Sequence, residues 1–316
     1  MLAGLSRPVE IVDDAFEHLC LDVFPDRVGT RLLIYLTARF DESENVQLDD
    51  AGNYVKPHIY TVAGWVAEVR NWKRQRADWD AAMRAYGLTR RGFHMTDFIG
   101  SYKDYADRDE WTAEVKEQRF KQLAKIIKKN NLYGFGSSLH AKDFDEVIAP
   151  ELEKRGLKNR YYGFNIVRVL EDIEEWIDAQ SYREPVSVHY VFAQGHGADA
   201  DISWLFNLLC NEPELHERFR IGEQPWSAGD MKRDGRLQPA DILACLANRS
   251  CVRFEDTFKF STEHWWEVLV NETVRNGRPP LREILYNDKE TMLNWLKRSP
   301  TIEGLFRPTA KGFKGI

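Results

Sequence analysis

The sequence lacks the short motifs that would assign it a familiar chemistry. Its four cysteines include no CxxC pair, so the usual spacing of a zinc site is absent. No Gly-x-Ser-x-Gly occurs, and the "GFGSS" stretch at 134–138 is not followed by Gly-Lys-Ser/Thr. These absences argue against a zinc module, an α/β-hydrolase and a phosphate-binding loop.

Long hydrophobic runs are absent as well. The longest stretch without Asp, Glu, Lys or Arg has fourteen residues, Pro185 to Ala198, which is too short to cross a bilayer as a helix. The N-terminus carries no apolar signal core. Together with cysteine usage that suits a reducing compartment, these features predict a cytoplasmic protein that does not contact membranes.

The chain has no overall excess of basic residues. With 44 Lys and Arg against 50 Asp and Glu, its formal charge is −6, which excludes nucleic-acid binding through global positive charge. Basic residues are nevertheless concentrated in the segments 70–91 and 119–129. A solvated helix face explains each run, and contact with phosphates is the alternative. The candidate phosphate contacts are Arg70, Lys73, Arg74, Arg90, Arg91 and Lys232.

Apolar residues are abundant, at 43% hydrophobic and 12% aromatic, which suffices for a sizeable core. Apolar runs rich in β-branched residues predict strands at 31–40, 58–68, 132–141, 185–193 and 218–228. Helical periodicity predicts helices at 68–86, 110–129, 159–180, 199–210 and 238–249. This order predicts an α/β domain with a mixed sheet, in which the first two strands pair antiparallel.

The predicted organisation has three parts. Residues 1–30 form a helical lead-in, and residues 31–250 form the α/β domain. The helices at about 68–129 are an insertion between its second and third strands. Residues 251–316 form a helical C-terminal extension that ends in a loosely held tail.

Two acids occupy positions where α/β sheets bind ligands. Asp41 ends the first predicted strand and is followed by Glu42, and Asp241 lies in the first turn of the 238–249 helix. A turn and a helix start also explain these two positions. If the helix packs over the first strand, however, the carboxylates face each other and repel. A divalent cation, Mg²⁺ or Mn²⁺, would resolve that repulsion.

The hexapeptide "FHMTDF" at 93–98 places His94 and Asp97 between aromatic residues. Thr96 or Asp97 could cap a helix by accepting a backbone N–H bond. The alternative is that His94 and Asp97 join the other acids in one pocket.

Five stretches together resemble a known family: "FDES", "VAGWVA", "FHMTDF", "VFAQGHG" and "LQPADILA", in this order. They resemble the bacterial domain-of-unknown-function 3800 family over roughly residues 31–250. That family is similar to the ribonuclease H-like superfamily, which implies a mixed sheet flanked by helices and metal-dependent nuclease chemistry. The resemblance implies that Asp41 is the central metal ligand and Asp241 the ligand from the late helix. It also implies that His94 and Asp97 are site residues.

Ala193 departs from the pattern of that family. The family's fourth strand typically ends in Phe-acid-x-Gly, whereas this chain has "FAQG" at 192–195. Three explanations are open: a deliberate replacement of Glu or Asp by Ala, a naturally inactive member, or a substitute oxygen ligand from a neighbouring acid. In each case the loss of one ligand weakens the hold on a metal.

The leading hypothesis is a divalent-metal-dependent nuclease acting on DNA or RNA in a bacterial defence or mobile-element setting. Asp41, Asp241 and Asp97 would hold Mg²⁺ or Mn²⁺, with Glu42 at the same oxygen-rich corner, and His94 would carry a proton or contact a phosphate. A defence setting would also provide a partner protein. The alternative is a binding module for nucleic acid or protein that kept the scaffold and lost catalysis.

Overall fold

The computed structural model describes residues 33–44, 47–48, 54–55, 58–88, 92–105, 110–154, 160–194, 198–257, 264–274, 281 and 284–298. The predicted lead-in at 1–30 and the C-terminal tail lie outside the described residues. Within the described ranges, no helix is long and apolar enough to span a membrane.

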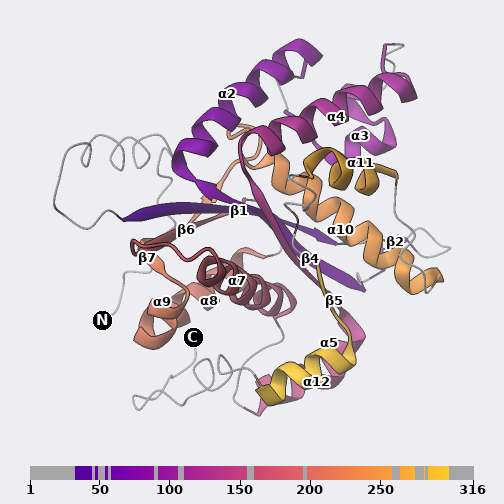
Figure 1. The fold of residues 1–316 in the computed structure, drawn as a ribbon. Coiled ribbons are helices and arrows are strands. Elements are labelled where there is room, and N and C mark those ends of the chain that lie inside the picture. Colours follow the sequence, from indigo (N-terminus) through magenta and orange to yellow (C-terminus); the bar gives the residue numbers. More distant parts are fainter. Residues whose placement is uncertain are drawn as a thin grey trace, which may run out of the picture.

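The core of the fold is a mixed six-stranded sheet in the order β7-β6-β1-β4-β5-β8 (Figure 1). Its strands are β1 (Ile34–Glu44), β4 (Ile59–Glu68), β5 (Tyr133–His140), β6 (Val186–Ala193), β7 (Ile221–Gly229) and β8 (Leu285–Asn287). A separate short pair consists of β2 (Gln47–Leu48) and β3 (Tyr54–Val55). β1 pairs antiparallel with β4 and parallel with β6, which confirms the predicted antiparallel pair and the mixed sheet.

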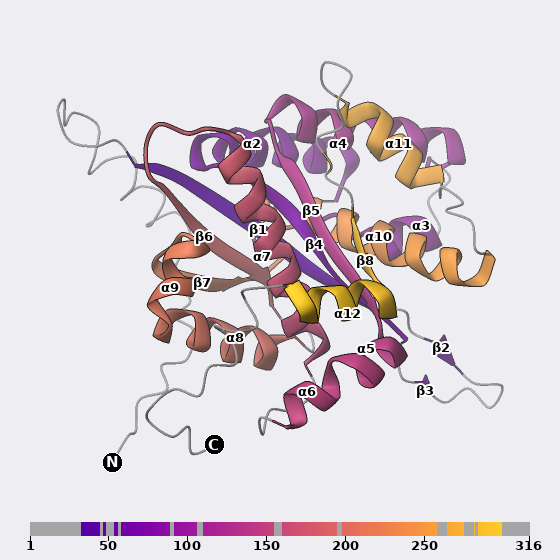
Figure 2. The same ribbon diagram turned by 60° about the horizontal axis from the view of Figure 1, so that its bottom comes forward.

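Helices cover both faces of the sheet. One face carries α2 (Val69–Tyr86), α3 (Met95–Gly100), α4 (Ala113–Lys129), α10 (Gln238–Thr257) and α11 (His264–Thr273) (Figure 1). The other face carries α7 (Tyr161–Ala179), α8 (Asp199–Asn211) and α9 (Pro213–Arg218), and α7 crosses the sheet in Figure 2. At the end of this layer lie α5 (Ala141–Val147), α6 (Ala149–Glu153) and α12 (Lys289–Arg298). The five helices predicted between residues 68 and 249 form, with boundaries shifted by a few residues or, for α10, extended to Thr257.

The region predicted as a helical C-terminal extension contributes to the main sheet. Its strand β8 pairs in parallel with β5, and α12 packs against α5. β8 has only three residues, which is too short for a period-two pattern to stand out in the sequence.

The alternation of side chains along β1 assigns its residues to two cores. Leu36, Ala38 and Phe40 belong to the core under α7, so the intervening residues point toward the α2 and α10 face. Arg39 and Asp41 therefore share one face of the strand, although both are buried. This alternation brings a buried charge of each sign to the α10 side.

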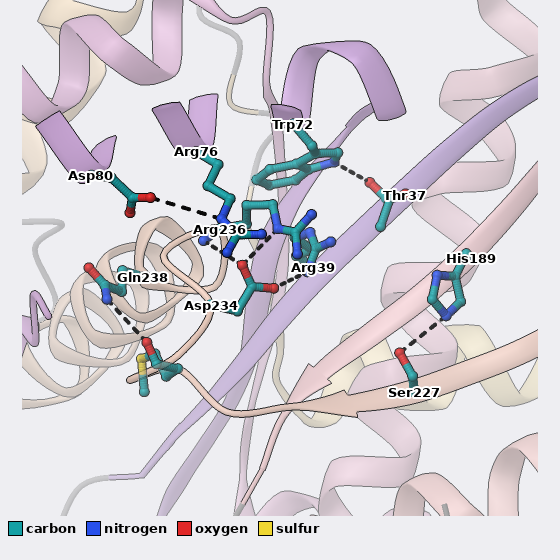
Figure 3. A network of polar contacts seen from close by, with 11 residues as sticks. Thr37, Arg39, Trp72, Arg76, Asp80, His189, Ser227, Asp234, Arg236 and Gln238 are labelled. Atoms are coloured by element: carbon teal, nitrogen blue, oxygen red, sulfur yellow. Dashed lines mark hydrogen bonds and ion pairs between the residues drawn. The ribbon is translucent and has the colours of Figure 1, made fainter. Parts of the chain in front are cut away.

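Arg39 is held by a buried ionic network (Figure 3). Its guanidinium donates to Asp234 Oδ2 at 2.7 Å, and Arg236 Nε donates to Asp234 Oδ1 at 2.7 Å. The Arg39 guanidinium also lies 5.3 Å from the centre of the Trp72 ring. The network ties β1 to α2 and to the loop that leads into α10, so it fixes where α10 begins relative to β1.

We expect Asp234→Ala to lower the free energy of unfolding by about 3–5 kcal/mol, because it leaves two buried guanidiniums without their shared carboxylate. The measurement is urea denaturation followed by circular dichroism. Asp80→Ala is the control, since Asp80 lies 3.9 Å from Arg76 in a partly exposed pair. Its cost should stay below about 1 kcal/mol. If both variants lower the free energy of unfolding equally, the network of Arg39, Asp234 and Arg236 contributes no more to stability than an exposed ion pair.

Candidate functional site

The first turn of α10 holds the segment that contains "FHMTDF". Gln238 Oε1 accepts the Phe93 N–H at 2.9 Å, across 145 residues of sequence, and Asp241 Oδ2 accepts the Met95 N–H at 2.6 Å. α3 begins at Met95, with His94 as the N-cap and no capping bond from its side chain. The predicted cap by Thr96 or Asp97 is therefore wrong, because a carboxylate from α10 takes the N–H bond instead.

Gln238 forms several of the hydrogen bonds that join α10 to the neighbouring segments. Its Oε1 also accepts the Trp79 indole N–H at 2.7 Å, and its Nε2 donates to the Met231 carbonyl at 3.1 Å. Gly92 has φ +71°, and a Cβ there would lie 1.9 Å from Gln238 Nε2. Glycine is therefore required at 92 on two grounds, its backbone conformation and the space that the Gln238 amide occupies.

Asp41 and Asp241 meet on the α10 face of the sheet. α10 packs on β1 and β4, and Asn248, two turns after Asp241, donates to the Ser43 carbonyl at 3.3 Å. Both carboxylates are buried, with 2% and 5% of their residue surfaces exposed. Burial raises the pKa of Asp41 well above its usual value, and the charges of Asp241 and then Glu42 raise it further. The Glu42 N–H, 3.0 Å from Asp41 Oδ1, acts in the opposite direction.

His94 and Asp97 extend this group toward solvent. His94 Nε2 lies 3.7 Å from Asp241 Oδ1, and His94 Nδ1 lies 3.5 Å from Asp97 Oδ2. Lys103 places its Nζ 3.0 Å from the same Asp97 oxygen. The His94 side chain is 38% exposed, so it lies between the buried acids and the surface. The structure thus brings four predicted site residues into one chain of contacts: Asp41, Asp241, His94 and Asp97.

Glu42 lies on the opposite face of β1 from Asp41, because neighbouring strand residues point to opposite sides. Burial, followed by the charge of Asp199, raises the pKa of Glu42 to about 8. Glu44, on the same face, accepts a hydrogen bond from the Tyr162 hydroxyl at 3.2 Å. The strand's geometry therefore separates Glu42 from the Asp41 and Asp241 carboxylates, with which it was predicted to share a metal.

Ala193 lies beside Asp41 on the neighbouring parallel strand. Phe192 pairs in register with Phe40, and both rings belong to the core under α7. Ala193 therefore faces the α10 side, as Asp41 does, and it is 1% exposed. An acid at this position would border Asp41 directly, whereas alanine leaves an apolar methyl group there.

The predicted phosphate contacts at the start of α2 do not reach these acids. Because β4 runs antiparallel to β1, its last residue Glu68 lies opposite Leu36, about 16 Å along the strand from Asp41. α2 starts there, with Arg70 paired to Glu68 at 2.6 Å and Arg74 donating to Asn71. The intervening Lys73 lies on the same first turns of the helix.

For the other predicted basic residues, the structure shows no contact with these acids in the part of the chain that it describes. Arg90 and Arg91 lie outside the described residues. Lys232 is exposed in the loop before α10, where its backbone N–H donates to Asp230 Oδ1 at 2.9 Å. The basic run on α4 is paired with acids, as the Lys121–Glu117, Lys125–Glu272 and Lys129–Asp78 contacts show. This pairing favours a solvated helix face for α4.

The donor set for a metal is small. Among the described residues, no group of three or more His, Cys, Asp or Glu side chains is arranged to hold a metal ion. Comparisons with protein-family models, curated proteins and solved structures find no match for this chain. The proposed chemistry of the site therefore rests on its own residues.

Sequence reasoning missed two members of this region. Lys103 was not predicted, because no sequence pattern around it indicates that its side chain contacts Asp97. The Arg39–Asp234 pair was missed because its partners are 195 residues apart. A lone arginine inside an otherwise apolar strand was the available signal, since a buried charge requires a partner.

We expect the stability of the protein to fall as the pH rises from about 4.5 to about 8, because the folded state raises the pKa of Glu42 to about 8. The stabilising proton is fully bound below the unfolded pKa and is lost through the folded pKa. Glu42→Gln should remove much of this fall and raise the free energy of unfolding at pH 8 by about 2–5 kcal/mol. Urea denaturation at several pH values across this range measures the free energy of unfolding of both proteins. Glu290→Gln, on an exposed position of α12, should keep the original profile.

Proposed function

We propose that the protein is a divalent-metal-dependent hydrolase of phosphodiester bonds in nucleic acid, with a ribonuclease H-like fold. The observation that carries the proposal is the proximity of two buried carboxylates, Asp41 on β1, which continues to Glu44, and Asp241 in the first turn of α10. The order of elements and the resemblance to the domain-of-unknown-function 3800 family support it. The cytoplasmic location and the bacterial defence or mobile-element setting are part of the same proposal.

The two carboxylates suit a cation that completes its shell with other oxygens. Mg²⁺ is usually bound by one or two protein carboxylates together with waters and substrate phosphates, so a cage of three or more acids is not required. Asp241 can accept the Met95 N–H and still offer lone pairs, because a carboxylate has about four acceptor sites. Mg²⁺ or Mn²⁺ bound here would lower the pKa of a water and offset charge on the phosphate.

The chain's own residues supply the remaining functions. The surrounding fold shields Asp41 and Asp241 from bulk water, and a bound cation would favour their charged forms. His94 lies between Asp241 and Asp97, with Nδ1 buried, and its Nε2, 3.7 Å from Asp241 Oδ1, is the nitrogen that would exchange a proton with substrate or water. Asp97 orients the Nδ1 side of that imidazole, and Lys103 offsets the charge of Asp97. The attachment of Met95 to Asp241 fixes His94 relative to the buried acids.

A second candidate function is a nucleic-acid or protein binding module without catalysis. The methyl group of Ala193 beside Asp41 favours it, because this position would carry a third acid in the related pattern. In that case the buried pair is a structural remnant, and Asp41→Asn would leave the function of the protein in cells unchanged.

Asp241→Asn separates the structural from the chemical role of Asp241. Asparagine keeps a carbonyl oxygen for the Met95 N–H but removes the charge, so the fold should persist while cation binding is lost. We expect Mn²⁺ to raise the melting temperature of the natural chain by several degrees and to leave that of Asp241→Asn unchanged. Asp80→Asn should respond like the natural chain. A Mn²⁺ shift that survives in both Asp241→Asn and Asp41→Asn would contradict the proposed site.

Ala193→Asp and Ala193→Glu test catalysis directly. An acid at position 193 would add an oxygen ligand beside Asp41, and we expect Mn²⁺-dependent cleavage of mixed DNA and RNA substrates to increase at least about tenfold. The same change combined with Asp41→Asn should be inactive. If the acidic variants fold and bind Mn²⁺ but cut no substrate, the nuclease proposal fails and the binding module is favoured.

A further inference from the structure

A short turn at the rim of the site displays an aromatic ring and a cation to solvent. Tyr102 is 60% exposed, more than the other large hydrophobic residues in the described ranges that are exposed, Leu33 and Leu293. The neighbouring Lys103 side chain is 56% exposed. The turn therefore presents a flat ring and a positive charge side by side, the two groups that contact a base and a phosphate.

The turn is held rigidly in this conformation. Ser101 and Lys103 have φ values of +57° and +49°, which are unfavourable for residues with a Cβ. The buried Lys116 spans the turn, donating to the Phe98 carbonyl at 2.6 Å and to Ser101 Oγ at 2.7 Å. The Tyr102 N–H donates to the Asp97 carbonyl at 2.9 Å. The surrounding structure therefore stabilises a backbone that presents Tyr102 and Lys103 outward.

The turn is also adjacent to the proposed catalytic group. Lys103 Nζ lies 3.0 Å from Asp97 Oδ2, and Asp97 lies 3.5 Å from His94. Within the described part of the chain, the predicted basic contacts of α2 begin at the far end of β1. Lys103 is therefore the described lysine that directly contacts an acid of this group.

We propose that Tyr102 and Lys103 form a substrate-binding rim that selects single-stranded nucleic acid, an inference that rests on the proposed nuclease function. An exposed ring binds a nucleobase by stacking, which requires a base that is not already stacked within a duplex. The ammonium of Lys103 contacts the adjacent phosphate and moves from Asp97 to it. The rim thereby places the phosphate next to His94 and the buried acids.

Binding of fluorescein-labelled oligonucleotides tests the rim independently of cleavage. All variants carry Asp41→Asn and are measured without divalent cations, so that no substrate is cut and repulsion from the buried acids is reduced. Tyr102→Ala should weaken binding of a single-stranded oligonucleotide about 5- to 100-fold. It should change binding of the matched duplex by less than about twofold. Tyr102→Phe keeps the ring and should bind the single strand within about twofold of the parent.

Lys103→Gln tests the phosphate contact. The slope of log affinity against log salt concentration for the single strand should decrease by about 0.7, the loss expected for one phosphate contact. Lys289→Gln is the matched control, since Lys289 is 57% exposed and lies 2.8 Å from one carboxylate, Glu146. It should leave both the affinity and the slope unchanged, because α12 packs at the other face of the sheet.

Three results would overturn the rim: no binding of either oligonucleotide, equal losses for single strand and duplex in Tyr102→Ala, or equal effects of Lys103→Gln and Lys289→Gln. Failure of the rim leaves the nuclease proposal intact if Ala193→Asp cuts nucleic acid with Mn²⁺. Conversely, Tyr102-dependent binding without any cleavage by the acidic variants would support the rim on a non-catalytic protein.

Discussion

The structure around the site depends on one constraint, the burial of the Asp241 carboxylate between β1 and the 92–97 segment. A buried carboxylate is unfavourable unless hydrogen bonds or charges compensate it. The Met95 N–H at 2.6 Å supplies one such bond, and it determines where α3 begins. The charge of the same carboxylate raises the pKa of Asp41, so the fold holds two acidic groups together at an electrostatic cost.

The neighbouring charges show how the fold tolerates this arrangement. Arg39, two residues before Asp41 on the same face of β1, pairs with Asp234. Lys103 pairs with Asp97 at the surface. Burial and the charge of Asp241 raise the pKa of Asp41, and carboxyl groups perturbed in this way are concentrated at functional sites.

Ala193 is the residue that fits the nuclease proposal least well. Its methyl group borders Asp41 at the position where the related pattern carries an acid. In the proposed metal site, β1 and α10 each supply a carboxylate, whereas β6 supplies a methyl group. A substrate rim at Tyr102 and Lys103 would serve either a catalytic protein or one that only binds nucleic acid, because stacking and phosphate contact do not depend on the third acid.

The sequence by itself determined the mixed sheet, the antiparallel first pair and the place of Asp241 in the first turn of α10, because these follow from local periodicity and chain direction. The prediction that the first strand ends at Asp41 was wrong, since β1 continues to pair with β4 as far as Glu44. Two errors were avoidable on the same grounds. Strand alternation places Glu42 opposite Asp41, and an antiparallel β4 carries the start of α2 away from it. Only the tertiary structure decided that Gln238 binds Phe93, that Asp234 joins Arg39, and that Lys103 reaches Asp97. These contacts depend on how far each side chain extends and on residues with left-handed backbone. The periodicity of the local sequence predicts neither.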